Sequence, residues 1–373
     1  MNMQIFGIVN IKGVKMIIKN TKHKEIINIV SEFMKPFPVY ITGGFVRDSL
    51  LNVDSNDIDF CTPSSPEEIE NKITSSLNKH GDHRKAIGVG KSFGCLKCKI
   101  LGEAIDIVSF RNEKYVKGSR KPEVNFVKDI TADLSRRDLT INAIAMRDGK
   151  IIDPFNGQQD LKDKIIRCVG KPTHRFKEDP LRMLRAGRFA SQLGFDIECA
   201  IYKAVKDVRH KILQVSKERW MIELDKILMT DKPSTALDFF METGLMNFII
   251  PALSLQYKYD QNSAYHTLDL WSHTSKALDA TPKDITLRWA ILLHDVGKPF
   301  VRTDKEKIGI CEKHEFNYTK TNYIKHDLVG AELVEQIARH LKWSNDRRIA
   351  VVDLVKNHLR DDSPLKEYDM KGK

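Results

Sequence analysis

Two aspartates in the stretch Ile41–Phe60, "ITGGFVRDSLLNVDSNDIDF", are separated by a single residue. Asp57 and Asp59 lie in a β-rich run, and the two-residue period of a strand places both carboxylates on one face. Two acceptor-only groups held side by side repel each other unless a cation bridges them. Mg²⁺ suits such ligands, because it is usually held by one or two carboxylates together with substrate phosphates. The pair therefore predicts a Mg²⁺ site.

The residues just upstream of this pair suit a phosphate. Gly43 and Gly44 let the backbone approach a phosphate closely. The following "FVRDSLL" is typical of a helix start, whose free N–H groups favour anions, and Arg47 adds a bidentate phosphate donor. Taken singly, these features fit a plain turn and a solvated strand end. Together, at this spacing, they predict a triphosphate cradle beside the Mg²⁺ site.

Two further charged clusters lie downstream. In "DLSRRDLTINAIA", the cluster of Arg136, Arg137 and Asp138 could hold ribose and triphosphate oxygens, with Asp138 orienting an arginine. A surface salt-bridge cluster fits this segment as well.

In "EDPLRMLRAGRFA", four charged residues recur every three positions and form a polar stripe on a predicted helix: Asp179, Arg182, Arg185 and Arg188. A carboxylate and a guanidinium can read the Watson–Crick edges of C and A, although a solvated helix face is the alternative.

Asp106, in "EAIDIVSF", lies in a second predicted strand that could run beside the first. It would then be a third carboxylate, able to activate an attacking hydroxyl. An ordinary edge-strand aspartate fits the same pattern.

A separate group of histidines and aspartates occupies the C-terminal part. His294 and Asp295 end an apolar helix in "RWAILLHDVGKP", where both can reach one metal. The other candidate ligands lie on neighbouring predicted helices: His273, His326 and either Asp353 or His358. Neutral imidazoles with carboxylates suit transition-metal ions. Helix packing and RNA contact are the alternative roles for these histidines.

The elements that must position these residues differ between the two parts of the chain. Short β-rich runs such as "FPVYITGG", "DIDFCT", "FGCLKCKI" and "AIDIVSF" alternate with helices predicted over Lys22–Met34 and Pro66–His80. From about residue 160 onward, helix spacing continues almost throughout. The pattern predicts an α+β head followed by a long helical body.

Composition limits the partners. The 373 residues carry a net charge of +11, which favours a polyanionic partner such as nucleic acid. No apolar run reaches transmembrane length, and the N-terminus lacks the apolar core and cleavage site of a signal peptide. We therefore expect a cytoplasmic protein without a membrane partner. Six scattered cysteines argue against a disulfide framework.

The motifs, taken in order, resemble the nucleotidyltransferases related to DNA polymerase β, and among these the class II tRNA nucleotidyltransferases and bacterial poly(A) polymerases. They are "ITGGFVRDSLLNVDSNDIDF", "DLSRRDLTINAIA", "DPFNGQQDL", "EDPLRMLRAGRFA" and "SKERWMIELDKIL". The histidine–aspartate pair resembles the HD phosphohydrolase superfamily, which some tRNA nucleotidyltransferases carry as a C-terminal domain. The resemblance implies three parts: a polymerase-β-like head with a small mixed sheet (16–150), a helical neck with a nucleotide-recognition helix (151–230), and an all-helical body with an HD-type domain (231–373).

The resemblance also implies roles for residues. Asp57 and Asp59 would hold two Mg²⁺ ions, Arg136 would contact the nucleotide, and Asp138 would help select ribose. Asp179 and Arg182 would act as an amino-acid template for incoming CTP and ATP, while Arg185 and Arg188 would hold phosphate or the helix frame.

The implied activity is template-independent addition of C and/or A to the 3′ end of tRNA, with release of pyrophosphate. A poly(A) polymerase acting on RNA 3′ ends shares every motif. From another class, an HD metal-dependent phosphohydrolase with an RNA-binding head is the second alternative. A non-catalytic RNA-binding protein would predict a broken Asp-x-Asp, and here that motif is intact.

Overall fold

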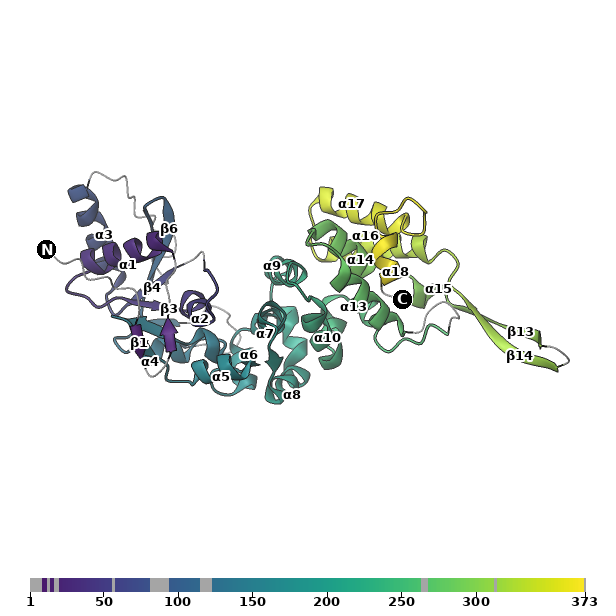
Figure 1. Cartoon of the computed structure of the whole chain (residues 1–373), viewed down its shortest axis with the longest axis horizontal. Helices are drawn as coiled ribbons and strands as arrows, with labels where there is room; N and C mark the ends of the chain where they lie inside the picture. The colour runs from purple at the N-terminus through teal and green to yellow at the C-terminus, as the bar shows by residue number, and fades with distance from the viewer. Residues whose placement is uncertain are drawn as a thin grey trace. The chain divides into compact units, whose positions relative to one another are not determined.

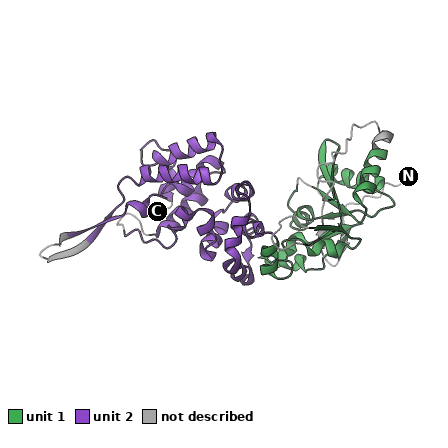
Figure 2. Cartoon of the chain, turned by 180° about the vertical axis from the view of Figure 1, so that it is seen from behind, with its two compact units in different colours: residues 1–178 green, residues 179–373 purple. Residues whose placement is uncertain are grey.

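The computed structural model describes residues 9–11, 14–16, 20–55, 58–80, 94–114, 123–262, 268–311 and 314–371. The chain separates into two compact units, residues 1–178 and 179–373 (Figure 2). This boundary falls inside the segment 151–230 expected to form the neck, so the division into three parts stays a prediction.

The first unit is built on a six-stranded mixed sheet with the order β10-β9-β3-β4-β6-β5. Its strands are β3 (Tyr40–Thr42), β4 (Asp59–Thr62), β5 (Cys95–Ile100), β6 (Glu103–Ser109), β9 (Ala145–Arg147) and β10 (Lys150–Ile152). β4 and β6 are parallel, and the other neighbours are antiparallel. The expected small mixed sheet is confirmed.

The alternation of residues along these strands separates a buried face from a polar face. One register row runs through Leu96, Ile107, Phe60 and Ile41, all of them at most 4% exposed. The neighbouring row runs through Lys97, Asp106, Asp59 and Thr42. Because successive side chains point to opposite faces, burial of the first row presents the second on the other side of the sheet.

Helices pack against this sheet. α1 (Thr21–Phe33) and α3 (Pro66–His80) contact each other, and α3 also contacts β5 and β6 (Figure 1). Asn20 starts α1, because its side chain accepts hydrogen bonds from two free backbone N–H groups. Both helices were predicted from their apolar spacing, and their bounds agree to within one residue.

Shorter elements complete the first unit. They are β1 (Val9–Ile11), β2 (Val14–Met16), α2 (Gly44–Leu50), β7 (Arg111–Lys114), β8 (Glu123–Phe126), α4 (Ile130–Ser135), η2 (Thr140–Asn142), α5 (Gly157–Asp163), β11 (Ile165–Ile166) and α6 (Pro172–Glu178). α4 and η2 carry the cluster that includes Arg136 and Asp138.

The second unit is mainly helical. Its helices are α7 (Leu181–Leu193), α8 (Cys199–Val208), η3 (Arg209–Gln214), α9 (Lys217–Leu228), α10 (Ser234–Thr243), α11 (Met246–Ile249), α12 (Pro251–Ser254), α13 (Leu270–Ala280), α14 (Ile285–Leu293), α15 (Lys298–Val301), α16 (His326–His340), α17 (Asn345–Lys356) and α18 (Lys366–Lys371), with a short strand β12 (Asp196–Ile197). α7 packs closely on α10 at Gly187. A Cβ atom at this position would lie 2.6 Å from the Phe240 ring, so the contact requires glycine.

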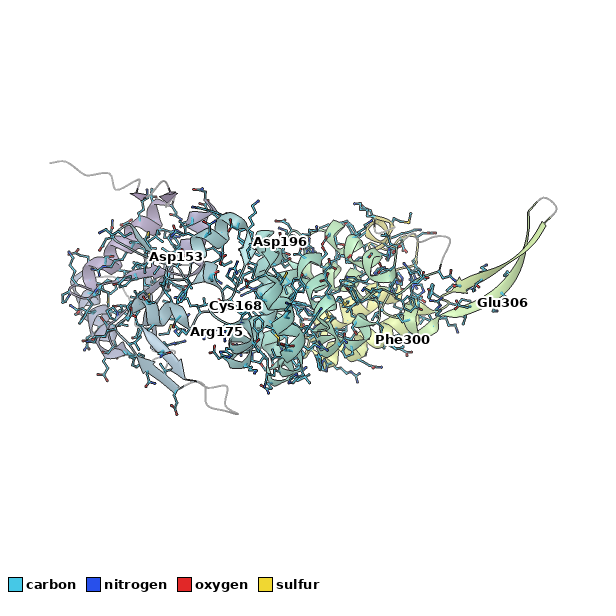
Figure 3. The ribbon with its side chains drawn as sticks, turned by 90° about the horizontal axis from the view of Figure 1, so that it is seen from below. Asp153, Cys168, Arg175, Asp196, Phe300 and Glu306 are labelled. Carbon is cyan, nitrogen blue, oxygen red and sulfur yellow. The ribbon has the colours of Figure 1, made fainter. Side chains whose placement is uncertain are left out.

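One element departs from the expected all-helical body. β13 (Thr303–Cys311) and β14 (His314–Asn322) form a two-stranded antiparallel ribbon that projects from the helices of the second unit (Figures 1 and 3). The apolar residues of this segment do not recur at the three- to four-residue spacing of an amphipathic helix.

Among the helices that the structure describes, none combines the length and the apolar character that a bilayer span requires.

Candidate functional site

The polar row of the sheet brings two of the predicted carboxylates together. Asp59, at the start of β4, is directly opposite Thr42 of β3 on one side and Asp106 of β6 on the other. Residues paired in this way have their side chains on the same face and about 5 Å apart. The structure thus places Asp106 beside Asp59, as the third-carboxylate hypothesis requires. Asp57 lies outside the described residues.

Gly43 closes one side of this row. Its φ of +73° is a conformation that residues with a side chain rarely adopt. A Cβ atom there would lie 2.9 Å from Arg137 Nη1 and 3.5 Å from Asp59 Oδ2. Glycine is therefore required for two reasons, and the backbone at Gly43 lies between a cation and a carboxylate.

A buried aspartate organises the arginines next to this site. Asp133, at 1% exposure, accepts a hydrogen bond from Arg136 Nη2 at 2.7 Å and lies 3.6 Å from Arg137 Nη2. Arg137 also donates to Thr42 Oγ1 at 2.8 Å and to the Asn142 carbonyl at 3.2 Å. Sequence reasoning included Arg137 in the cluster with Arg136 and Asp138 but gave it no role of its own, and it missed Asp133, which lies in the same quoted motif.

Two residues have different surroundings from those expected. The Arg47 guanidinium is buried and donates to Asp48 and to Asn142 Oδ1 at 2.8 Å each. Burial favours these protein partners over a solvated phosphate, so the structure gives Arg47 a framework position. The Asp138 carboxylate accepts from the Leu139 N–H at 2.8 Å and from Asn142 Nδ2 at 3.3 Å. These contacts hold the turn after α4.

The carboxylates of the sheet fit a divalent cation. Asp59 is exposed, Asp106 is half-buried, and both offer hard oxygen ligands, which Mg²⁺ prefers. A cation already faces them, since Lys97 Nζ lies 3.1 Å from Asp106 Oδ1. The hydrogen bond and the charge of Asp106 raise the pKa of Lys97. Sequence reasoning did not select Lys97.

The predicted template residues lie at the start of α7 in the second unit. Asp179 precedes the helix, and its Oδ1 accepts from the Leu181 N–H at 3.1 Å. Its Oδ2 is 2.7 Å from Arg219 Nη2 of α9, so a second helix fixes the carboxylate. Arg182, one turn on, is 9% exposed. Arg219 lies 40 residues away along the chain, and no local pattern pairs it with Asp179.

The two later arginines of the stripe face α9. Arg188 Nε is 2.6 Å from Glu223 Oε2, and its Nη1 donates to Gln192 at 3.0 Å. Arg185 Nη1 lies 3.9 Å from Glu223 Oε1, and both guanidinium groups lie over the Phe189 ring. Of the two roles that were open, phosphate contact or helix frame, these contacts favour the frame.

In the HD-type region the imidazoles are oriented by the backbone. The Nδ1 atoms of His294, His326 and His358 lie 2.6–2.7 Å from the carbonyls of Ile291, Tyr323 and Val355. A carbonyl only accepts, so each Nδ1 carries the proton and each neutral imidazole points a lone pair from Nε2. Fixing the tautomer in this way is typical of metal-ligating histidines.

These Nε2 atoms meet in two pairs. His273 Nε2 is 3.2 Å from His294 Nε2, and His326 Nε2 is 3.1 Å from His358 Nε2. Two lone pairs at this distance repel unless a cation lies between them. Nitrogens bound at 2.0–2.1 Å to one tetrahedral ion would be roughly 3.3 Å apart. The spacing fits one metal ion for each pair.

One aspartate faces both pairs. Asp295 Oδ2 lies 3.4 Å from His273 Nε2 and 3.1 Å from His294 Nε2, while Oδ1 lies 3.2 Å from His326 Nε2 and 3.8 Å from His358 Nε2. The ligand atoms form two groups that share Asp295. This arrangement suits two ions bridged by a carboxylate.

The structure replaces one expected ligand. Asp353 is exposed on α17 and accepts from Asn357 Nδ2, whereas His358 is buried in the cluster. Asp353 lies within α17, whereas His358 follows the end of that helix at Lys356, and only His358 turns into the cluster. Instead, Asp369 of α18 approaches the first pair, with Oδ1 2.8 Å from His273 Nε2 and 3.2 Å from His294 Nε2. Nothing in the sequence around Asp369 indicated this.

Charge and burial oppose each other within the cluster. Burial disfavours the charged form of His294, but Asp295 and Asp369 outweigh it and raise its pKa to about 10. Burial is likewise outweighed at Asp295, where His294 and Lys298 hold the pKa well below its usual range. Burial and the charge of His294 lower the pKa of His358 to about 4. A cation is thus favoured beside Asp295, whether it is a proton or a metal ion.

Three family models match the chain in succession. Residues 39–167 match the poly(A) polymerase head domain, residues 194–256 match the probable RNA and SrmB-binding site of polymerase A, and residues 264–371 match the HD domain. Curated relatives are CCA-adding enzymes. The chain therefore combines a poly(A) polymerase head domain, an RNA-binding segment of the same polymerase and an HD domain.

Two relatives illustrate the similarity. The CCA-adding enzyme of Ligilactobacillus salivarius is 39% identical over 234 residues, which are 59% of this chain and 55% of the relative. That of Bacillus velezensis is 36% identical over 279 residues, 71% of this chain and 65% of the relative. The chain therefore spans between about half and two thirds of the length of these curated relatives.

A solved structure gives the same fold. The CCA-adding enzyme of Bacillus stearothermophilus, solved in complex with CTP, is 25% identical in sequence and superposes with a TM-score of 0.60. The match covers 95% of this chain and 82% of that enzyme's chain. Members of the nucleotidyltransferase and HD families use divalent metals, which agrees with the oxygen donors in the head and the imidazoles in the second unit.

Proposed function

We propose that this chain adds C and A nucleotides, without a nucleic-acid template, to the 3′ end of tRNA and releases pyrophosphate. The observation that carries the proposal is the row of Thr42, Asp59 and Asp106 with Gly43 and Arg137 beside it. Its chemistry is that of phosphoryl transfer, where positioning and charge stabilisation dominate. CTP and ATP as substrates are supported by relatives that are CCA-adding enzymes.

In the head, the proposed reaction forms one bond and breaks one bond. The 3′-hydroxyl of the RNA attacks the α-phosphate, the bond from that phosphorus to the bridging oxygen breaks, and pyrophosphate leaves. Asp57 and Asp59 would hold two Mg²⁺ ions, and these ions supply charge neutralisation and hydroxyl activation when bound. Asp106, opposite Asp59, would accept the hydroxyl proton. Arg137, fixed by Thr42 and Asn142, would face the triphosphate next to Gly43.

In the second unit, Asp179 and Arg182 would select the base. Arg219 holds the Asp179 carboxylate at 2.7 Å and leaves Arg182 as the neighbouring donor one turn along. A fixed acceptor and a fixed donor can pair with the Watson–Crick edges of both C and A. This favours addition of C as well as A, although a poly(A) polymerase shares the same pair of residues. The cytoplasmic location expected from the sequence stays a prediction.

One incubation series tests the proposal. The purified protein is incubated with Mg²⁺ and CTP or ATP, and with tRNA ending at the discriminator base, at C, at CC, or with an unstructured RNA. We expect C, C and then A, restricted to tRNA. Long A tails on any RNA would establish the poly(A) polymerase instead. Asp59→Ala and Asp106→Ala should each abolish incorporation and leave RNA binding near the wild-type value.

A second candidate function is metal-dependent phosphohydrolysis at the HD centre. The observation that favours it is the convergence of four imidazole nitrogens on the two oxygens of Asp295. Such a centre suits Mn²⁺ or another transition-metal ion. Phosphate release from model phosphoesters that requires Mn²⁺ and is lost in Asp295→Asn would support it. An equal rate in that variant would contradict it.

A further inference from the structure

The ribbon of β13 and β14 has no role in either reaction, yet it is a prominent feature of the second unit (Figure 1). Each strand has nine residues, so the ribbon extends about 30 Å. Its described side chains at 303–307 and 319–320 are exposed. Glu306, labelled in Figure 3, lies on the ribbon outside the helices.

The two faces of the ribbon carry opposite charges. Alternation and register place Thr303, Lys305 and Lys307 on one face with Asn322 and Lys320 of the partner strand. Asp304 and Glu306 lie on the other face, opposite Thr321 and Thr319. Among the described side chains of the ribbon, one face therefore carries lysines and no acidic residue. The other face carries acidic residues and no basic residue.

The basic face contains an unfavourable pair. Lys305 is directly opposite Lys320, and like charges at this position destabilise an antiparallel pair. No ion pair to Lys305, Lys307 or Lys320 occurs within the described residues, although neighbouring charges are neutralised: Arg302 Nε lies 3.1 Å from Asp304 Oδ2. An anion lying between the two lysines would remove the repulsion.

The root of the ribbon is fixed, so its faces have defined directions. On the acidic side, Thr321 Oγ1 donates to Asp304 at 2.7 Å and accepts from Asn262 at 3.0 Å. Beyond β14, Tyr323 donates to the Gln261 carbonyl at 2.7 Å. These bonds hold the acidic side of the root against the segment around Gln261, so the basic face is directed to the opposite side of the ribbon.

We propose that this basic face, defined by Lys305, Lys307 and Lys320, binds the phosphate backbone of RNA. The inference rests on the proposed function, which supplies a polyanionic substrate. Lysine binds phosphate as a point charge, without reading sequence.

Three alternative roles for the ribbon predict different outcomes. Lysines on exposed strand edges also prevent edge-to-edge aggregation. In that case removing them would cause association of the protein and leave RNA affinity unchanged. If only the net charge of the protein attracts RNA, any charge on the ribbon would count equally, on either face. If the ribbon binds a protein partner, RNA affinity would be unaffected by the lysines.

The test measures equilibrium binding of a fluorescent tRNA without its CCA end, with no nucleotide present, between 50 and 200 mM salt. The double variant Lys305→Gln/Lys320→Gln should bind about tenfold more weakly at 0.1 M salt, with a salt slope lower by about 2. Lys305→Arg/Lys320→Arg keeps both charges and should bind like wild type. Glu306→Gln changes the charge of the acidic face only and should leave the slope unchanged.

Three results overturn the inference: an unchanged slope in the double glutamine variant, aggregation of that variant with wild-type affinity, or a gain in Glu306→Gln equal to the loss in the lysine variant. Failure of the proposed function is distinguishable from these. A wild-type protein that binds tRNA but adds no nucleotide would contradict the function and leave the ribbon assignment standing. Normal nucleotide addition with unchanged tRNA affinity in the lysine variant would contradict only the ribbon assignment.

Discussion

At the scale of single residues, Gly43 is where the backbone, a carboxylate of the sheet and an arginine meet. Gly43→Ala forces a φ of +73° on a residue with a side chain and places a methyl group 2.9 Å from Arg137 Nη1. Displacing a catalytic group by a fraction of an ångström to 1 Å can reduce a rate about 100-fold. We expect incorporation to fall 10- to 100-fold, roughly, measured as kcat/KM for CTP.

Gly102 is the matched control for this substitution. It has a φ of +83°, but a Cβ there would have no atom within 4 Å. Gly102→Ala therefore carries the same backbone strain, about 1–2 kcal/mol, without the clash. Both variants should lose similar stability in urea unfolding, and only Gly43→Ala should lose activity. Equal activity in the two variants would refute the close approach of the Gly43 backbone to the site.

Asp179 gives the second prediction at this scale. Without its carboxylate, the acceptor of the proposed template is missing, while the triphosphate contacts of the head remain. A hydrogen-bonded base contact contributes about 1–3 kcal/mol of discrimination. In Asp179→Ala we expect the preference for CTP and ATP over UTP and GTP to fall by about 5- to 150-fold, measured as ratios of kcat/KM.

Arg219 separates positioning from direct recognition. Arg219→Ala removes the partner that holds Asp179 at 2.7 Å, so it should lower the same ratio by less than Asp179→Ala does. Arg219→Lys, which restores a cation, should recover part of the loss. Unaltered base preference in Asp179→Ala would show that the carboxylate is not read by the nucleotide.

The residues that sequence reasoning identified share a local signal. Gly43, Asp59 and Asp106 could be placed because strand alternation and a glycine turn are properties of a few neighbouring positions. Arg219 and Asp369 could not, since each reaches its partner only through tertiary packing across 40 and 75 positions. The contacts of Arg47 with Asp48 and Asn142 could not be predicted either, because a motif indicates residue type but not burial, and its phosphate role stays a prediction.

At the scale of elements, α7 and α9 are joined by a buried ion pair. Arg188 and Glu223 are 8% and 4% exposed, with 2.6 Å between Nε and Oε2. Removing one partner of such a pair leaves an uncompensated buried charge and costs about 3–5 kcal/mol. Arg188→Met should therefore destabilise the protein by about this amount, and Glu223→Met similarly. Urea unfolding measures both.

The double variant decides between framework and phosphate contact. Replacing both charges with methionine removes the unpaired charge, so Arg188→Met/Glu223→Met should recover most of the stability that each single variant loses. If Arg188 instead held a phosphate, Arg188→Met would keep its stability and lose nucleotide affinity. That outcome would contradict the frame that the contacts with Glu223 and Gln192 favour.

The elements themselves were largely predictable where hydrophobic periodicity was strong. α1 and α3 have apolar residues at helix spacing, and buried residues alternate with more exposed ones along β5 and β6. β7 and β9 escaped prediction because short strands of three or four residues carry too little pattern. The ribbon of β13 and β14 was missed for another reason. Both of its faces are exposed near the root, so no apolar face marks it as a strand.

At the scale of the whole molecule, two kinds of metal chemistry are separated between the two units. The first unit offers carboxylate oxygens at Asp59 and Asp106, and the second offers imidazoles around Asp295. Hard oxygen sites suit Mg²⁺, whereas imidazole sites suit transition-metal ions. One chain can thus hold two classes of ion without competition, and removal of one class should leave the other site loaded.

Thermal unfolding with Ni²⁺, an ion that imidazole ligands suit, tests this separation. A ligand at 100 times its Kd stabilises the folded state by about 2.7 kcal/mol. We expect Ni²⁺ to raise the Tm of the wild type and of Asp59→Asn, but not of Asp295→Asn. The rise should be larger at pH 8 than at pH 6. In the metal-free protein the pKa of His294 is raised to about 10, so a proton occupies the ligand nitrogen throughout this range and must leave when the metal binds. Higher pH weakens that competition. A Tm rise that is independent of pH, or that persists in Asp295→Asn, would place the Ni²⁺ elsewhere than between these histidines.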